Sequence, residues 1–204
     1  MNETPGRKKL LVASGNPGKL KEYQILAAGH PLDLRLLPGF AALPEFPEDA
    51  PTFAENAAGK ALYYSKHSEE MVFADDSGLV VPSLDGAPGV LSARYAGPGA
   101  SSEKRNDKLL AALRGKQGAE RTAYFACVIA LAQQGRCLAV VSGKVDGEIL
   151  EQPCGSGGFG YDPVFYFRAL GKSLAELPAE EKNQHSHRGN AFRRLMDVVV
   201  GPAF

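Results

Sequence analysis

Apolar and polar positions along this chain form short blocks that are typical of interspersed strands and helices. Apolar runs rich in branched and aromatic residues end at Gly, Pro or Asp, and several lead into segments with apolar residues at helical spacing. The runs predict strands at residues 9–14, 33–37, 71–74, 123–132, 137–142 and 163–167, an extended run at 79–82, and a strand pair within 142–151 turned at Asp146-Gly147. The helical spacing predicts helices over about 17–27, 52–65, 101–114, 178–184 and 189–200.

The first two predicted helices begin with clear capping residues. Asn16 is a favourable N-cap and Pro17 suits the first helical position, directly after the first strand. Thr52 and Glu55 have the spacing of a capping box. The order of elements predicts an α/β protein with a mixed, twisted central sheet and flanking helices.

Composition narrows the class of protein. The 204 residues suit one large domain or two closely packed lobes, with 44% hydrophobic and 23% charged residues and a formal net charge of zero. This charge disfavours a nucleic-acid binder, which usually has a basic excess, but it allows a small anionic ligand. No run approaches the roughly 20 apolar residues of a membrane span, and the N-terminal stretch lacks a signal-peptide pattern. Three cysteines without metal-ligand spacing are typical of reduced thiols, so we expect a soluble cytoplasmic protein.

The segment from Ser14 to Lys19 is a candidate anion site. Its loop amides precede a helix N-terminus, where anions bind favourably, and Lys19 adds a full positive charge. It is not a P-loop, because Leu20 follows Lys19 where that motif needs Ser or Thr. A plain capped helix with a solvated lysine remains the alternative.

Carboxylates form a second candidate group. Asp75 and Asp76 end a predicted strand, and Glu45, Glu48 and Asp49 lie in the loop before the helix predicted from Thr52. Mg²⁺ prefers oxygen ligands and usually takes one or two carboxylates together with substrate phosphates. Because neighbouring strand residues point to opposite faces, one aspartate can face a metal or water while the other braces the site. A turn rich in Asp, Ser and Gly is the structural alternative.

Glycines and aromatic residues mark a third group, at Gly155–Gly160. The spacing matches GxGxxG, but a β-type run rather than a helix follows, so a dinucleotide-binding turn is disfavoured. The turn precedes Phe159 and Tyr161, which we expect to form an exposed aromatic pair beside a flat ligand. A purely structural turn is equally compatible with the sequence.

Two further groups offer hydrogen-bond donors. Residues 182–189 gather Lys182, His185, His187 and Arg188 between two helices, which suits recognition of a carbonyl or phosphate oxygen. The alternative is a polar loop between helices. Asn56 and Lys60 share one face of the second helix, which can equally be solvated surface.

Together these groups are far more specific than any one alone. In the order and the amino-acid sequences of these motifs, the chain resembles the inosine-triphosphate pyrophosphatase family, house-cleaning enzymes that remove deaminated purine nucleotides. The matching stretches, which lie between residues 14 and 189, are SGNPGKLKE, TFAENAAGKA, ADDSGL, GAPGVLSARYAG, GSGGFGYDP and EEKNQHSHRG. Residues 1–7 extend beyond the family's usual start, and His185 stands where an apolar residue is expected.

The resemblance implies a central sheet split into two lobes around a substrate cleft, within a single pyrophosphatase domain over residues 1–204. It also implies a homodimer, dependence on Mg²⁺, and hydrolysis of ITP, dITP and XTP between the α- and β-phosphates. The products would be the nucleoside monophosphate and pyrophosphate.

Site residues follow from the same resemblance. The triphosphate would be held by Ser14, Gly15, Asn16, Pro17, Gly18, Lys19 and Lys60. Asp76 would be the general base or a metal ligand, with Glu48 as its metal partner and Glu45 as the alternative, and Ser77 would touch the substrate. The base pocket would be formed by Phe159, Gly160, Tyr161, Asp162, Lys182, His187 and Arg188.

Donor and acceptor chemistry links these residues to base selection. Hypoxanthine and xanthine carry an oxygen at position 6 that Lys182, His187 or Arg188 can donate to, whereas adenine presents an amino donor there. Guanine shares the oxygen at position 6, so its 2-amino group must be refused in another way. Two other functions remain open: a pyrophosphatase for another modified nucleotide, and a nucleotide-binding module without turnover.

Overall fold

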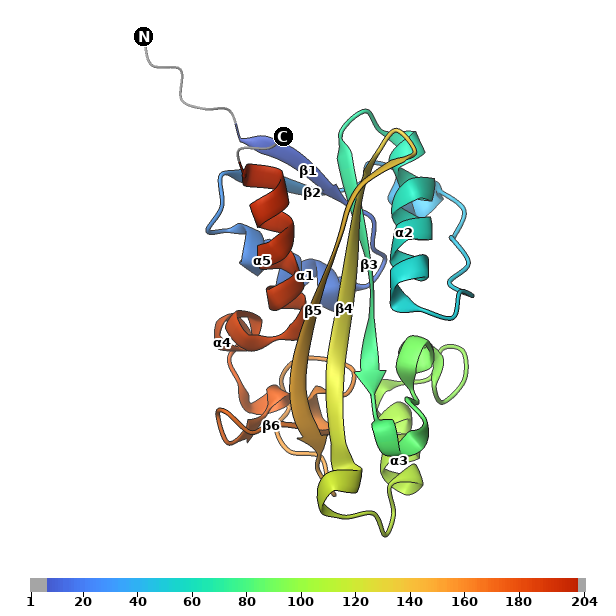
Figure 1. Ribbon diagram of the computed structural model, residues 1–204, viewed down its shortest axis with the longest axis vertical. Coiled ribbons are helices and arrows are strands. Elements are labelled where there is room, and N and C mark those ends of the chain that lie inside the picture. The colour runs from blue at the N-terminus through green and yellow to red at the C-terminus, as the bar shows by residue number, and fades with distance from the viewer. Residues whose placement is uncertain (1–6, 202–204) are drawn as a thin grey trace. The chain divides into compact units, whose positions relative to one another are not determined.

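A computed structural model describes residues 7–201, so the predicted N-terminal extension lies almost wholly outside the described residues. Its strands form a seven-stranded sheet in the order β2-β1-β3-β4-β5-β6-β7 (Figure 1). The strands are β1 (Lys8–Val12), β2 (Leu32–Leu36), β3 (Met71–Val80), β4 (Thr122–Gln133), β5 (Arg136–Ile149), β6 (Phe165–Phe167) and β7 (Lys172–Ser173). The helices are α1 (Pro17–Ala27), α2 (Phe53–Tyr64), α3 (Ser102–Ala112), α4 (Ala179–His185) and α5 (His187–Val200).

The sheet is mixed, which confirms the predicted fold class. β1 pairs in parallel with both β2 and β3, whereas β6 pairs antiparallel with both β5 and β7. β4 and β5 are joined by Gln134 and Gly135, which both have positive φ, at 49° and 76°. This conformation is typical of the tight turn that matches the twist of an antiparallel hairpin.

Two predicted strand boundaries are wrong. The sequence predicted that the strand beginning at Met71 ends at Asp75, yet β3 continues through the aspartates to Val80. The strand pair predicted within residues 142–151 is instead the second half of β5, which runs unbroken past Gly147. A side chain at Gly147 would collide with the Tyr166 carbonyl and the Phe165 ring, so this glycine allows close packing against β6 rather than a turn.

Residues cluster into two compact units. Unit 1 contains the described residues up to Asp76, together with Val128–Ser142 and the residues from Ala191 onward. Unit 2 contains Ser77–Cys127 and Gly143–Asn190. The boundaries fall within β3, β4, β5 and α5, so the same strands contribute residues to both units.

Unit 1 has an apolar layer on each face of its strands. Val72 and Ala74 pack in the cluster that includes Ala57 and Ala61 of α2. Phe73, which points the other way, contacts Tyr23 of α1 and Phe192 of α5 at ring separations of 4.9 and 6.3 Å. Because side chains alternate along β3, α2 packs against one face of the strand, and α1 and α5 pack against the other (Figure 1).

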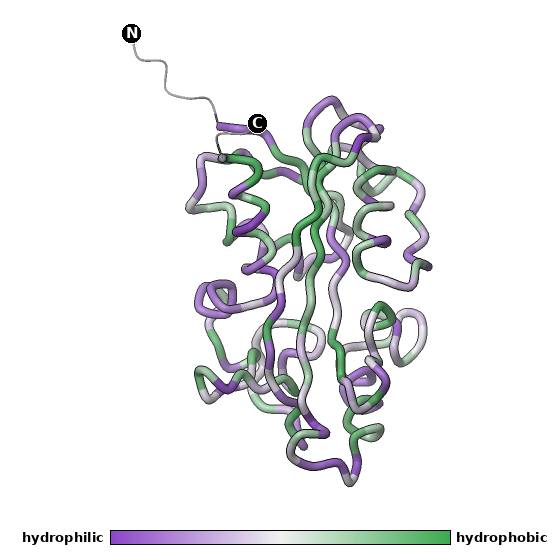
Figure 2. The backbone as a smooth tube through the Cα atoms, viewed as in Figure 1, coloured by the Kyte–Doolittle hydropathy of each residue, from purple (hydrophilic) through white to green (hydrophobic). Residues whose placement is uncertain are grey.

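Unit 2 has its own core. α3 contributes Leu109 and Leu113, which are fully buried with Leu79, Phe165 and other residues of this unit. Figure 2 shows that the strongest apolar stretches run along β4 and β5 in unit 1, whereas the unit 2 part of β5 alternates between apolar and polar positions. None of the described helices is both long and apolar enough to cross a bilayer.

Candidate functional site

The loop between β1 and α1 has the predicted cap. Asn16 Oδ1 accepts a hydrogen bond from the Lys19 amide at 3.1 Å, Pro17 occupies the first helical turn, and the buried Ser14 Oγ accepts from the Asn16 amide at 3.3 Å. The cap therefore holds the loop in one conformation. This conformation directs Lys19 toward β3, where its Nζ lies 2.9 Å from Asp75 Oδ2.

Six side chains of unit 1 form what we call the carboxylate cluster: Lys19, Glu48, Asn56, Lys60, Asp75 and Asp76. Lys60 Nζ donates to Glu48 Oε1 at 2.6 Å and to the Asp75 carbonyl at 3.2 Å. Asn56 Nδ2 donates to Asp76 Oδ2 at 3.0 Å. The predicted alternative of a solvated helix surface is wrong for Asn56 and Lys60, because both side chains are buried.

Burial gives the acidic members of this cluster unusual electrostatics. Asp76 is only 5% exposed, and desolvation raises its pKa to about 6, with the charges of Glu48 and Asp75 adding to the rise and Lys19 opposing it. Desolvation alone would lower the pKa of Lys60, but the negative charges of Asp75 and Glu48 outweigh it and the pKa is raised. Lys60 therefore stays protonated, while Asp76 can exchange a proton near neutral pH.

The donor atoms of the cluster suit a hard cation. Of the two predicted metal partners of Asp76, Glu48 is half-buried and ion-paired with Lys60, whereas Glu45 is exposed. Among residues 7–201, no three His, Cys, Asp or Glu side chains form a ready-made metal cage. One or two carboxylates without a complete cage is the arrangement with which Mg²⁺ binds beside substrate phosphates.

A second group, the aromatic–cation cluster, lies in unit 2 and consists of Ser77, Phe159, Asp162, Lys182, His187 and Arg188. Lys182 Nζ and the Arg188 guanidinium carbon lie 4.9 and 5.6 Å from the centre of the Phe159 ring. Arg188 also donates to Ser77 Oγ at 2.8 Å. Cations gathered at an aromatic face provide donors beside a surface on which a flat ring can stack.

Buried contacts hold this cluster in place. Asp162 Oδ2 accepts from the Phe159 amide at 2.8 Å and is ion-paired with Lys182. The His187 ring stacks on Phe125, with centroids 4.7 Å apart and an interplanar angle of 11°. Asp162 thus holds both the Phe159 backbone and the lysine that lies over the Phe159 ring.

Tyr161 does not form the predicted exposed pair with Phe159. Its side chain is buried in the core of unit 2, where its hydroxyl donates to the Ser92 carbonyl at 2.9 Å and desolvation raises its pKa. Of these two aromatic side chains, only Phe159 is partly exposed to solvent. The aromatic side chain four residues before β6 is therefore a core residue rather than part of an exposed pair.

Sequence reasoning missed two residues that support this loop. Asn106 of α3 is buried and donates to the Gly160 carbonyl at 3.2 Å. Ser92 accepts from Tyr161 and, through its hydroxyl, from the Leu79 amide at 2.9 Å. For Asn106, the sequence signal was a polar side chain three residues before Leu109, on the apolar face of α3.

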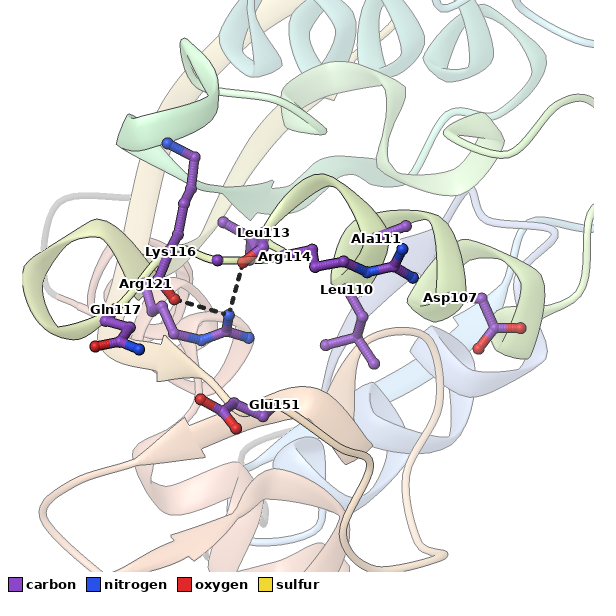
Figure 3. A pocket seen from close by; sticks show the side chains of 10 residues that line it. Asp107, Leu110, Ala111, Leu113, Arg114, Lys116, Gln117, Arg121 and Glu151 are labelled. Atoms are coloured by element: carbon purple, nitrogen blue, oxygen red, sulfur yellow. Dashed lines mark hydrogen bonds between the residues drawn. The ribbon is translucent and has the colours of Figure 1, made fainter.

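The lining of a pocket in unit 2 includes none of the predicted site residues (Figure 3). It measures about 470 Å³ and is lined mainly by the C-terminal half of α3 and the residues that follow it, with Arg121 and Glu151. Arg121 donates to the carbonyls of Leu113 at 3.0 Å and Ile149 at 2.7 Å, so its guanidinium joins the end of α3 to β5. We assign this arginine a structural role.

Comparisons with known proteins place the whole chain among relatives of one kind. Residues 10–198 match the Ham1 family. A dITP/XTP pyrophosphatase of Listeria monocytogenes is 46% identical over 192 residues, which cover 94% of this chain and 95% of that protein. A dITP/XTP pyrophosphatase of Geobacter sulfurreducens is 48% identical over 189 residues, covering 93% and 95%.

A solved structure agrees in fold. The HAM1 protein of Coxiella burnetii superimposes with a TM-score of 0.84 at 39% identity and covers 95% of this chain and 98% of its own. The family match, the identity over nearly the full length and the common fold all agree with the resemblance identified from the motifs. The chain therefore belongs to the Ham1 family.

Proposed function

We propose that this protein is a Mg²⁺-dependent pyrophosphatase that hydrolyses dITP, XTP and ITP to the nucleoside monophosphate and pyrophosphate. The curated relatives bear the name dITP/XTP pyrophosphatase and match over nearly the whole chain. Its biological role would be to clear deaminated purines from the nucleotide pool.

Asp76 is the observation that carries the proposal. A carboxylate with a pKa of about 6, nine-tenths or more buried beside Lys19, Lys60 and Glu48, is suited to accept a proton from water near neutral pH. A module that only binds nucleotide has no need to bury such a group. This argues for turnover rather than binding alone.

Positive groups around Asp76 can neutralise the phosphate chain. Lys19 and Lys60 are held by ion pairs with Asp75 and Glu48, so both cations are already in position before substrate arrives. Glu48 and Asp76 would hold Mg²⁺, which supplies further positive charge to the phosphate oxygens when bound. Asp76 would orient the attacking water and take its proton, while Lys19 and Lys60 stabilise the charge that develops on the phosphoryl oxygens.

Base selection belongs to the aromatic–cation cluster in this proposal. Phe159 provides a stacking face, and Lys182, His187 and Arg188 provide donors for the oxygen at position 6. Adenine would bring its amino donor against these donors and leave buried groups unpaired, which is the kind of mismatch that sites discriminate strongly.

A substrate panel tests the proposal. The purified protein is incubated with dITP, XTP, ITP, dATP, dGTP and a pyrimidine triphosphate, with Mg²⁺ or with EDTA, and pyrophosphate release is measured. We expect Mg²⁺-dependent release from dITP, XTP and ITP and little from the others. Strongest release from a pyrimidine triphosphate would instead support an enzyme for another modified nucleotide.

We also propose that the protein is a cytoplasmic homodimer, as the motif resemblance implies. The free state of Cys127, Cys137 and Cys154 is compatible with a reducing compartment. Sedimentation equilibrium at several protein concentrations tests the dimer, and a single species of about 22 kDa, the 21.7 kDa mass of one chain, would contradict it.

A further inference from the structure

Gly59 lies in the middle of α2, where glycine is among the poorest helix formers. Its place is explained by the loop that carries Glu48. A side-chain carbon added at Gly59 would lie 2.5 Å from Cζ of the Phe46 ring and 3.1 Å from Cε1. Gly59 therefore forms a notch in α2 that receives the Phe46 ring.

The same loop is attached to α2 at other points. The Tyr64 hydroxyl accepts from the Phe46 amide at 3.0 Å and donates to the Pro44 carbonyl at 3.3 Å. At the other end, Asn56 exchanges two hydrogen bonds with the Ala50 backbone, at 3.0 and 3.2 Å. Both ends of the Pro44–Ala50 loop are thus tied to one helix.

Glu48 lies between these two attachments, in a stretch without helix or strand of its own. Its carboxylate accepts from Lys60, one residue after Gly59 on α2. Without regular structure, such a loop samples many conformations, and each attachment removes some of that freedom before a ligand binds. Carboxylates must be held to within about 0.5 Å for productive metal binding.

We propose that the packing of Phe46 into the Gly59 notch positions Glu48 for Mg²⁺, making Gly59 and Phe46 positioning residues for the metal. This inference rests on the proposed function, specifically on Glu48 as a metal ligand. Neither residue touches substrate; both act through the conformation of the Pro44–Ala50 loop.

The variant Gly59→Ala tests the notch directly. Alanine favours the helix, so α2 itself should be retained, while the added carbon must displace the Phe46 ring. Gly29→Ala is the matched control, because nothing lies within 4 Å of a carbon added there and its φ is not positive. Circular dichroism and thermal melts establish that each variant is folded.

The first readout is direct metal binding, measured from the electron paramagnetic resonance signal of free Mn²⁺. The metal-free full-length protein is titrated with Mn²⁺ in the presence of the α,β-methylene analogue of ITP, which is not hydrolysed. We expect Gly59→Ala to weaken Mn²⁺ binding about tenfold, the scale of losing a group that orients a metal ligand. Gly29→Ala should bind as the wild type does.

The second readout is the Mg²⁺ dependence of turnover. In Gly59→Ala the Mg²⁺ concentration for half-maximal rate should rise by about the same factor, while the preference for ITP over ATP stays as in the wild type. A general loss of structure would lower the rate at every Mg²⁺ concentration, and that result would overturn the inference.

Phe46→Leu completes a double-mutant cycle. If the notch acts through the ring, Gly59→Ala should change Mn²⁺ affinity less than twofold when Leu replaces Phe46, because the colliding atoms are gone. An equal, additive loss in both backgrounds would overturn the inference.

Glu48→Gln separates the inference from the proposed function. We expect it to weaken Mn²⁺ binding at least as much as Gly59→Ala does. Unchanged binding in Glu48→Gln would overturn the metal role of Glu48 and the inference with it. Weakened binding in Glu48→Gln but wild-type binding in Gly59→Ala would overturn the inference alone.

Discussion

At the scale of single residues, Asp76 illustrates how a proposed catalytic group works against the stability of the fold. Its pKa in the folded chain is about 6, above the usual value of 3.8. The folded state therefore binds more protons than the unfolded state between these two pH values, so this group destabilises the fold as the pH rises through the window. The full difference corresponds to about 3 kcal/mol at neutral pH.

The substitution Asp76→Asn should consequently stabilise the metal-free protein. We expect the free energy of unfolding at pH 7.5 to rise by about 1–3 kcal/mol, since a neutral amide avoids the cost of a buried charge. Urea unfolding with EDTA present measures the gain, which should shrink toward pH 4. Asp197→Asn, on the exposed side of α5, is the control. A less stable Asp76→Asn protein at pH 7.5 would contradict this, because it would show that the groups around Asp76 already offset the cost of burying its charge.

Arg188 is the residue on which base preference is expected to depend most. It lies over Phe159 and donates to Ser77, and it is only 2% exposed. We expect Arg188→Ala to lower the ratio of kcat/KM for ITP to that for ATP by about tenfold, because a donor to the oxygen at position 6 is lost. Arg168→Ala, at an exposed arginine of the same unit, should keep the ratio. An unaltered ratio in Arg188→Ala would remove this residue from base recognition.

At the scale of elements, the helix starts were predictable while parts of the strands were not. Asn16 and Thr52 cap their helices as expected, because an N-cap is a local hydrogen bond between residues close in sequence. The Asp-Asp-Ser-Gly stretch of β3 looks like a turn but continues as a strand. β1 pairs with β3 only as far as Phe73, and the other neighbour, β4, is distant in sequence, so no local pattern records that the strand continues.

The same distinction applies to the candidate site. Glu48, Lys60 and Asp76 stood out because charged residues gathered in short motifs. The Gly59 notch and the support from Asn106 depend on contacts between residues 13 and 54 positions apart, respectively, which only the folded chain brings together. Tyr161 was misplaced for a related reason: an aromatic residue after a glycine-rich turn can point outward or inward, and only the packed core decides.

The contact between α3 and the base loop gives a prediction at this scale. Asn106→Ala removes the donor to the Gly160 carbonyl and leaves that partly buried group without this partner. We expect the free energy of unfolding to fall by about 1–3 kcal/mol and KM for ITP to rise, with the Mg²⁺ requirement unchanged. Denaturant unfolding and initial rates measure both effects. Asp107→Ala, an exposed neighbour on α3, should alter neither quantity, and a raised Mg²⁺ requirement in Asn106→Ala would contradict this role.

At the scale of the whole molecule, the proposed function assigns chemistry and base selection to different units. Asp76, the last β3 residue of unit 1, belongs to the carboxylate cluster, and the next residue, Ser77, belongs to the aromatic–cation cluster of unit 2. The strand β3 therefore contributes Asp75 and Asp76 to the first cluster and Ser77 to the second. The predicted convergence of Lys19, Asp76 and Arg188 on a single nucleotide, in a cleft between two lobes, stays a prediction.

This division of roles has a kinetic consequence. A change in the carboxylate cluster should lower turnover for every base to the same degree, because the phosphate chain is common to all nucleotides. A change in the aromatic–cation cluster should act on the ratio between bases.

The most direct test is kcat/KM for dITP and dATP in the wild-type protein and in Asp76→Asn, measured by pyrophosphate release at saturating Mg²⁺. The account predicts that both values fall together by at least ~10²-fold, the scale of losing an acid–base group, and that their ratio stays as in the wild type. Turnover at the wild-type rate in a folded Asp76→Asn protein would contradict the account. So would a fall in the ratio of kcat/KM for dITP to that for dATP.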